Sequence, residues 1–269
     1  MILRKIYKLI EKLGPDSKIM LSVTEVGLRI FHLLKLGKEP QQRFVIYMQG
    51  RSGSSFFCDL LDQHPLIRCN SEILNKKRYN PIKFLRDLSY YYGEKYPVWG
   101  FKFKGYRLGL HNISAEDFLQ QLSSKQFKVI SLTRYNSLRT ALSTWVAYKR
   151  GDQYHNTDEI QERKKVTVSI DELIGAIERA EEIRQEMKDN LNKVDALELV
   201  YEVDLATPEK AAASCERAFR YLGVDPIEVK SKFRKVSTGR LSDDLENAEA
   251  IYEFIKNSKY AHFLEGVSL

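Results

Sequence analysis

A run of glycine, serine and arginine near residue 50 is the segment of this chain best suited to chemistry. An apolar stretch leads into Gln49-Gly50-Arg51-Ser52-Gly53-Ser54-Ser55, and an amphipathic stretch follows. A strand, a tight loop and a helix in this order point backbone N–H groups into a hollow at the helix N-terminus, whose partial positive charge attracts oxyanions. Glycine permits the backbone angles and the close approach that this hollow needs. The sequence therefore predicts an anion-binding loop made of Gly50, Arg51, Ser52, Gly53, Ser54, Ser55 and Phe56.

The loop differs from the phosphate loop of ATPases. That motif needs G-x-x-x-x-G-K-[ST], in which the lysine reaches the outer phosphates and the hydroxyl holds Mg²⁺. Here the two glycines are three residues apart, Ser54 stands where the lysine would follow, and Arg51 precedes the second glycine. The positive charge is thus at the front of the loop, and we expect no metal ion. A Gly/Ser turn that only joins a strand to a helix remains the alternative.

A second candidate anion site follows the apolar stretch 129–132. Arg134 comes at the end of this stretch, and Ser143 lies nine residues later in a segment with helical periodicity. Arginine supplies charge and a fork of donors, and serine supplies a directional hydroxyl, so the pair can clamp one phosphate. Ser137 or Arg139 can share this role. The alternative is an arginine that caps the strand end and a serine on a half-buried helix face.

The elements that must position these residues can be read from the periodicity. Four apolar runs predict buried strands at 43–48, 98–103, 127–132 and 197–203. Helical periodicity predicts helices at 54–63, 81–92, 115–123, 137–149, 169–192, 209–222 and 243–256. Strands that alternate with helices indicate an α/β fold, here a three-layer P-loop-like domain with a central parallel sheet flanked by helices. The loops at 49–55 and 133–137 both follow strands, so they should meet at one edge of the sheet.

Composition limits the possible domain organisation, partners and cellular compartment. The 269 residues, 43% of them hydrophobic, suit one α/β domain at 41–269 behind an N-terminal helical extension at 1–40. A net charge of +7 favours anionic partners such as nucleotides, acidic glycans, nucleic acid or anionic lipid. Three scattered cysteines suit a reducing compartment and argue against a disulfide framework or a zinc site. No window approaches the roughly eighteen apolar residues of a membrane span.

The first thirteen residues have the pattern of a basic amphipathic helix. Apolar residues recur at helical spacing, and Arg4, Lys5, Lys8 and Lys12 stand beside them. This segment is too charged for the core of a signal peptide, and we expect a cytoplasmic protein. Such a helix either packs on its own domain, which is the more common arrangement, or lies peripherally on the inner face of the membrane.

The two constellations resemble the two nucleotide-binding elements of sulfotransferases that use 3′-phosphoadenosine-5′-phosphosulfate. The loop from Gln49 to Phe56 is similar to the family's 5′-phosphosulfate loop, in the Arg-Ser-Gly-Ser-Ser form of carbohydrate sulfotransferases. Arg134 and Ser143 resemble the 3′-phosphate element, although the spacing is nine residues here and eight in the family. Further segments resemble bacterial sulfotransferases of the Nod-factor and lipopolysaccharide type: Asn70-Ser71-Glu72-Ile73-Leu74, Trp99-Gly100-Phe101-Lys102, Val200-Tyr201-Glu202 and Leu241-Ser242-Asp243.

The resemblance implies transfer of a sulfuryl group from 3′-phosphoadenosine-5′-phosphosulfate to a hydroxyl, on a carbohydrate or a glycolipid. Arg51 would lie near the bridging oxygen of the donor, and Glu72 would face the acceptor as the base; a surface carboxylate at a helix start is the alternative for Glu72. His64 is the rival base, because imidazole titrates near neutrality, although His-Pro at a helix end is more often a stop signal. Lys102, which we expect just after a strand, can face the sulfuryl group or the acceptor. Lys235, Ser237, Thr238 and Arg240 resemble the basic segment that covers the 3′-phosphate in relatives.

Two other functions remain open from the sequence. One is a P-loop-like nucleotide kinase or NTPase, although the lysine–hydroxyl pair of its motif is absent from the loop. The other is a non-enzymatic binder of nucleic acid or anionic membranes, which the basic composition would suit. The polar segment 149–165 is a candidate acceptor-binding loop, and a plain connector is the alternative.

Overall fold

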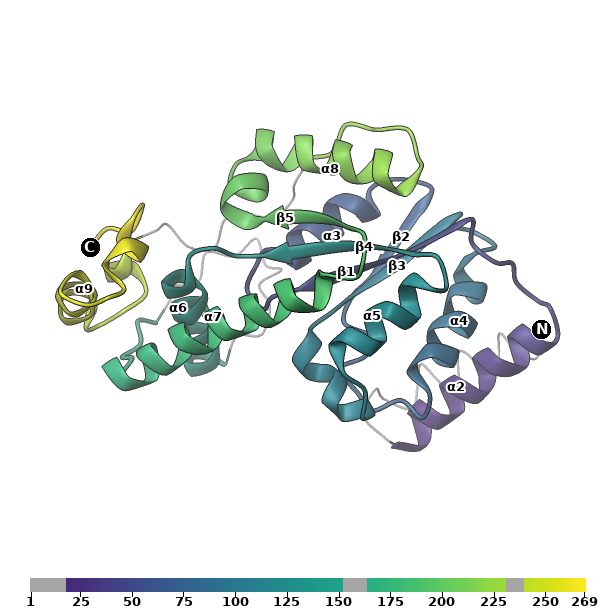
Figure 1. Cartoon of the computed structure of the whole chain (residues 1–269), viewed down its shortest axis with the longest axis horizontal. Helices are drawn as coiled ribbons and strands as arrows, with labels where there is room; N and C mark the ends of the chain where they lie inside the picture. Colours follow the sequence, from purple (N-terminus) through teal and green to yellow (C-terminus); the bar gives the residue numbers. More distant parts are fainter. Residues whose placement is uncertain (1–17, 152–163, 231–239) are drawn as a thin grey trace.

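The computed structural model describes residues 18–151, 164–230 and 240–269. Five strands form one sheet in the order β2-β3-β1-β4-β5, and every neighbouring pair is parallel. The strands are β1 (Gln42–Met48), β2 (Ile67–Asn70), β3 (Val98–Phe103), β4 (Phe127–Thr133) and β5 (Ala196–Val200). Helices cover both faces of the sheet (Figure 1). The predicted α/β fold with a central parallel sheet is confirmed.

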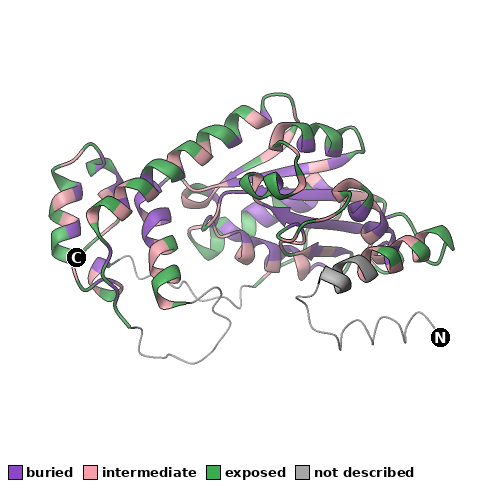
Figure 2. Cartoon of the chain, turned by 90° about the horizontal axis from the view of Figure 1, so that it is seen from below, coloured by how far each residue is buried: buried purple, intermediate pink, exposed green. Residues whose placement is uncertain are grey.

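The central strand β1 owes its place to an unbroken apolar run. Phe44, Ile46 and Met48 point into the core on one face, and Val45 and Tyr47 point into the core on the other. A strand buried on both faces needs such a run, because helices leave neither face to solvent. The purple strands at the centre of Figure 2 show this burial.

Two layers of helices enclose the sheet. On the face of Phe44 lie α3 (Ser54–Asp62) and α8 (Pro208–Leu222). On the face of Val45 lie α2 (Lys18–Leu33), α4 (Pro81–Tyr92) and α5 (Ala115–Ser123). Except for α2, which packs on α4, the apolar side of each helix therefore faces the sheet, as its periodicity predicts.

A third apolar cluster lies beyond the carboxyl edge of the sheet. It joins α6 (Ser137–Arg150), the first half of α7 (Ile170–Leu191) and α9 (Ala248–Lys256) with the chain between residues 241 and 267. Helix α7 is long enough to serve two clusters, since Leu173 and Ile177 belong to this one and Met187 belongs to the core under the sheet. Figure 1 shows α6, α7 and α9 extending away from the strands.

The structure departs from the predicted elements at three places. Strand β2 was not predicted, because a strand of four residues leaves too short a pattern. The strand predicted at 197–203 ends at Val200, whose N–H donates to Asp204 Oδ2 at 2.6 Å, and a π-helical turn, η2 (Tyr201–Leu205), follows. The helix predicted at 243–256 is a short 3-10 turn (Leu241–Asp243) followed by α9.

The N-terminal extension is described from residue 18 onward. Helix α2 packs on α4, where the His32 ring bonds to Asp87 Oδ1 at 2.6 Å and Arg78 pairs with Glu25 at 3.4 Å. Residues 1–13, with the predicted basic helix, lie outside the described residues, and the domain boundary at residue 40 stays a prediction. Every helix in the described part of the chain is too short or too polar to cross a lipid bilayer.

Candidate functional site

The two loops expected at one edge of the sheet do meet there. Arg51 Nε donates to Ser143 Oγ at 2.8 Å, which joins the loop after β1 to helix α6. Arg134 Nη1 donates to the carbonyl oxygen of Arg51 at 3.3 Å. The fold thus brings Arg51 together with Arg134 and Ser143, each of which lies more than eighty residues away from Arg51 in the chain.

The loop after β1 is folded by its own backbone and by Ser52. The buried Ser52 hydroxyl donates to the carbonyl of Gln49 at 2.7 Å, which closes a tight turn. Arg51 and Gly53 both have left-handed backbone angles, with φ of 63° and 81°. Gly53 is the N-cap of α3 and has no side chain with which to cap it. The first N–H groups of α3 are therefore left for an oxyanion to accept.

The Gln49 side chain locks this loop to its neighbours. Its Oε1 accepts the backbone N–H of Arg134 at 2.9 Å, and its Nε2 donates to the carbonyl of Ala180 on α7 at 2.9 Å. The residue is 1% exposed, so both bonds are shielded from water. The sequence placed Gln49 in the loop without a role, because the residue type does not indicate which distant backbone groups its side-chain amide will hydrogen-bond.

Arg134 is held between an aromatic ring and a carboxylate. Its guanidinium lies 4.8 Å from the centre of the Tyr201 ring, and its Nε donates to Glu202 Oε1 at 3.3 Å. Burial lowers the pKa of Arg134, while Glu202 acts in the opposite direction. An arginine pKa starts so high that the group stays charged near neutral pH. A buried cation whose orientation is fixed from two sides is suited to grip an anion.

Glu202 organises the turn between β4 and α6. Its Oε2 accepts the N–H of Tyr135 at 2.9 Å, and its Oε1 accepts that of Asn136 at 3.3 Å as well as the Arg134 side chain. Asn136 then caps α6 by accepting the N–H of Arg139 at 2.9 Å. The segment Val200-Tyr201-Glu202 was singled out by resemblance alone, and the structure gives Glu202 its positioning contacts.

A cleft of about 80 Å³ lies beside these loops, between α6 and the C-terminal segment. Four arginines line it, namely Arg134, Arg139, Arg150 and Arg240. Ser143 and one acidic residue, Asp244, line it as well. Asp244 is paired with Arg150 at 3.0 Å. The cleft therefore has a strong positive potential for its size.

Ser137 and Arg139, the two alternatives to Ser143 in the second anion site, lie in different environments. Arg139 lines the cleft, where its Nη2 donates to the carbonyl of Gly266. The Ser137 hydroxyl is buried without a hydrogen-bond partner among the described residues, and it does not line the cleft. Ser143, one residue beyond the family spacing, reaches both the cleft and Arg51.

Lys102 lies within β3, whose bounds match the predicted strand at 98–103, and not after the strand as its proposed role assumed. Its side chain is buried, and Nζ donates to Ser55 Oγ at 2.7 Å. Burial lowers the pKa of Lys102, and this outweighs the attraction of nearby groups such as Glu72. The ammonium group is thus held at the first turn of α3, next to the loop.

Glu72 lies on the same side of the loop. Its side chain is 5% exposed and pairs with Lys104 Nζ at 3.0 Å, and Asn75 Nδ2 donates to it at 2.9 Å. Burial raises the pKa of Glu72, but the charge and hydrogen bond of Lys104, together with Asn75 and the charge of Lys102, lower the pKa overall. A Cβ added to Gly50 would be 3.9 Å from Lys104 Cε, so this ion pair borders the loop.

His64 is not brought to the loop. It follows the last turn of α3, and the nine residues of that helix span about 13 Å. Its Nδ1 accepts the N–H of Leu66 at 3.2 Å, so Nε2 carries the proton and donates to the carbonyl of Asp225 at 3.1 Å. With both nitrogens engaged and 3% exposure, the ring helps to end α3 and to hold the chain beyond α8.

Some predicted site residues lie outside the described residues, namely Lys235, Ser237, Thr238 and the segment from 152 to 163. Arg240, which was grouped with them, is described and lines the arginine cleft. Across the described ranges, no group of three or more His, Cys, Asp or Glu side chains is placed to hold a metal ion.

Comparison with known proteins gives structural likenesses, among them one at low sequence identity. No protein-family model matches the chain, and no curated protein matches it. The chain is similar to a crystal structure of a sulfotransferase from Alicyclobacillus acidocaldarius, with a TM-score of 0.46 and 15% sequence identity, over 85% of this chain and 94% of that one.

Proposed function

We propose that the chain transfers a sulfuryl group from 3′-phosphoadenosine-5′-phosphosulfate to a hydroxyl of a carbohydrate or glycolipid. The observation that carries the proposal is the contact between Arg51 and Ser143 at 2.8 Å, which puts the anion loop and the arginine cleft side by side. The donor has two anionic ends joined by one nucleoside. Its 5′-phosphosulfate suits the uncapped end of α3, and its 3′-phosphate suits Arg134, Ser143 and Arg240.

The arrangement favours this donor over ATP. A kinase or NTPase loop places a lysine and a metal-binding hydroxyl at the start of the helix. In this chain Gly53 is followed by two serines, and the cation of the loop is Arg51. A 3′-phosphate needs a cationic site separate from the 5′ site, and the four arginines beside the loop would supply one.

The chemistry assigned to the loop is charge stabilisation. The acceptor oxygen forms a new S–O bond while the S–O bond to the phosphate breaks, and the loose transition state leaves charge on the bridging oxygen. Arg51 and the N–H groups of Gly53, Ser54 and Ser55 would stabilise that charge. Lys102, fixed on Ser55 Oγ at 2.7 Å, adds a second cation near the transferring group.

Glu72 would take the proton of the acceptor hydroxyl. Its lowered pKa keeps it ionised at neutral pH, so it is ready to accept. A weak base of this kind removes the proton only after the acceptor oxygen has begun to bond to sulfur and has become acidic. The products are a sulfate ester, adenosine 3′,5′-bisphosphate and a protonated Glu72, which releases its proton to water.

Calorimetric titration and a transfer assay test the proposal. Adenosine 3′,5′-bisphosphate should bind without Mg²⁺, and more tightly than adenosine 5′-phosphate or ATP. A donor labelled in its sulfuryl group should then transfer the label to one member of a panel of glycans, glycolipids and small alcohols. Binding of ATP that needs Mg²⁺, with no preference for a 3′-phosphate, would favour a kinase or NTPase and overturn the proposal.

A further inference from the structure

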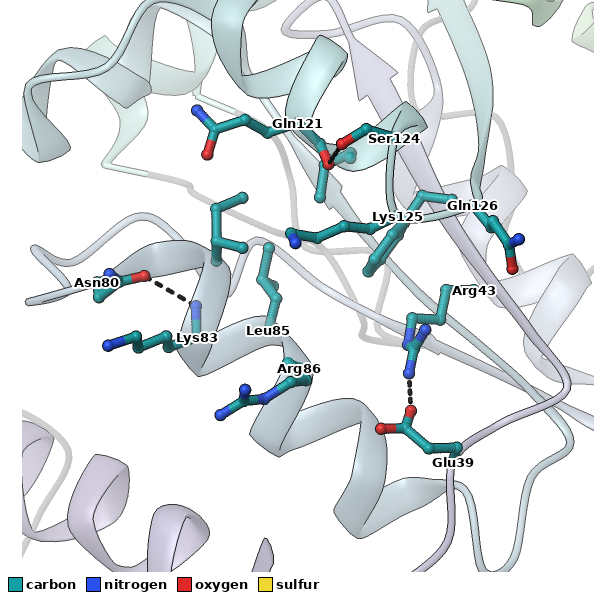
Figure 3. Close-up of a pocket in the computed structure, with 13 residues that line it drawn as sticks. Glu39, Arg43, Asn80, Lys83, Leu85, Arg86, Gln121, Ser124, Lys125 and Gln126 are labelled. Atoms are coloured by element: carbon teal, nitrogen blue, oxygen red, sulfur yellow. Dashed lines mark hydrogen bonds and ion pairs between the residues drawn. The ribbon is translucent and has the colours of Figure 1, made fainter.

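A second concave region lies at the amino ends of the strands, whereas the candidate site lies at their carboxyl ends. It is a groove of about 640 Å³ between α4 and the end of α5, where β1 and β4 begin (Figure 3). Strand β1 runs seven residues from this edge toward the anion loop. At about 3.3 Å per residue, the groove is roughly 20 Å from that loop. It therefore cannot share a small ligand with the candidate site.

The groove is rimmed by cations from three elements. Lys83 and Arg86 come from α4, Lys125 follows α5, and Arg43 belongs to β1. Arg43 is paired with Glu39, and Arg86 donates to Asp87 Oδ1 at 2.9 Å. Neither lysine forms an ion pair with any residue in the described ranges. Figure 3 shows Lys125 extended from the end of α5 toward α4.

The floor of the groove is apolar. Leu85 and Leu122 are each 1% exposed and Phe127 is 7% exposed, so the groove reaches down to side chains of the core. Ile82, on the first turn of α4, adds an apolar wall. An apolar floor with two lysines at its rim gains free energy from burying hydrocarbon and from pairing with negative charge.

We propose that this groove binds a small anion that carries an apolar chain. The anionic head would lie between Lys83 and Lys125, and the chain would lie on Leu85, Leu122 and Phe127. Inorganic phosphate would leave the floor in water, and an uncharged lipid would leave the ammonium groups without a partner. The volume is within the range of small-molecule sites, roughly 300–1,000 Å³. Alkyl phosphates, fatty carboxylates and the phosphate heads of lipids share this chemistry.

Calorimetry with n-octyl phosphate tests the proposal on the full chain. Octyl phosphate should bind at one site, and both inorganic phosphate and 1-octanol should bind at least tenfold more weakly. Lys83→Gln and Lys125→Gln should each weaken octyl phosphate at least fivefold. Lys188→Gln, which makes the same charge change on α7, should leave its affinity unchanged, and circular dichroism should show that all three variants melt like the parent.

The remaining outcomes overturn the proposal. Equal affinity for inorganic phosphate and octyl phosphate would remove the role of the apolar floor. Affinity that Lys83→Gln and Lys125→Gln leave unchanged would place the ligand elsewhere. Competition by adenosine 3′,5′-bisphosphate would place octyl phosphate in the arginine cleft. Because the groove is separate from that cleft, the proposed sulfuryl transfer can fail while this binding stands, and the reverse also holds.

Discussion

Arg51 has a backbone conformation that is unfavourable for arginine. A left-handed φ of 63° costs a residue with a Cβ about 1–2 kcal/mol. Glycine would fit the same turn without that cost. Arginine at this position instead provides the guanidinium that donates to Ser143 Oγ at the front of the anion loop. Strain of this kind is typical of residues kept for a site and not for the fold.

The first prediction concerns this guanidinium. Arg51→Ala should lower kcat/KM for sulfuryl transfer about 10²–10³-fold, which is the usual loss when a charge-stabilising donor is removed. Arg51→Gly should lose as much activity while its free energy of unfolding rises by about 1 kcal/mol, since the strain is relieved. Steady-state kinetics and urea unfolding measure the two effects. If the alanine variant turns over at the parent rate, Arg51 has no part in the reaction.

The second prediction concerns the buried Lys102. Because burial lowers its pKa, the unfolded chain holds this proton more tightly than the folded chain. Stability should therefore increase as the pH rises from the lowered pKa to the ordinary lysine value. Lys102→Met should remove that increase, raise the free energy of unfolding at pH 7, and abolish most of the transfer activity. Urea unfolding at pH 7 and pH 10 measures the first two effects.

Lys188→Met is the matched control for Lys102, because it removes a lysine from the outer helix α7. It should change neither the alkaline dependence nor the activity. If Lys102→Met lowers the stability at pH 7 by more than the control does, the buried charge contributes to the fold and the interpretation is wrong.

At this scale the sequence predicted which side chains lie close together but not the groups that support them. The proximity of Arg51, Arg134 and Ser143 was predictable because each follows a strand or lies in the next helix. Gln49 and Glu202 were not given roles, since their bonds to the Arg134 loop cross 85 and 68 residues of chain. The imidazole of His64 suits catalysis, but the structure places it after α3, at the helix end that was the alternative interpretation.

At the scale of elements, the turn from β4 to α6 depends on a carboxylate supplied by the turn after β5. Glu202 accepts from Tyr135 N–H and Asn136 N–H, and it also holds Arg134. Glu202→Gln should therefore raise the Kd for adenosine 3′,5′-bisphosphate about tenfold and raise the donor KM, with little change in kcat, because an amide pairs less well with these donors.

Glu198→Gln, on the exposed face of β5, is the control for Glu202 and should bind the bisphosphate like the parent. A Glu202→Gln variant that binds the bisphosphate normally would mean that the turn is held without this carboxylate. A loss of kcat at unchanged Kd would instead put Glu202 among the reacting groups.

The start of α3 depends on the glycine that caps it. At Gly53 a Cβ would be 2.8 Å from the Tyr201 ring, and φ is 81°. Gly53→Ala should lower the free energy of unfolding by about 1–3 kcal/mol and weaken the bisphosphate, because Tyr201 and the N–H groups of α3 must shift. Gly109→Ala, where nothing lies within 4 Å, should do neither. Equal stability of the two variants would contradict the predicted close fit.

Elements with long patterns were predictable, and those set by a single contact were not. Helices α4 and α5 match their predicted ranges, since their apolar residues recur over more than two turns and Asn80 and Ser114 cap them. Strand β5 ended three residues early because the Asp204 carboxylate captures the N–H of Val200. The hydrophobic periodicity of the sequence gives no indication of such a bond.

At the scale of the whole molecule, the candidate site lies where two separately packed parts meet. The anion loop belongs to the sheet, whereas Ser143, Arg150 and Arg240 belong to the third apolar cluster or border it. Helix α7 connects the two parts, and Gln49 Nε2 is bonded to it at Ala180. A ligand that contacts both the loop and the cleft should therefore join parts that are otherwise linked through few elements.

The last prediction follows from that arrangement. At one hundred times its Kd, adenosine 3′,5′-bisphosphate should raise the free energy of unfolding by about 2.7 kcal/mol, as mass action requires for a ligand that binds only the folded chain. Hydrogen exchange should slow in residues 49–57 and also in 240–245, since the cleft includes Arg240, Leu241, Asp244 and Leu245. Exchange at 81–86, in the groove between α4 and α5, serves as the internal control and should not change. Slowing confined to 49–57 would mean that the nucleotide does not reach the arginine cleft, and that the four arginines serve another anion.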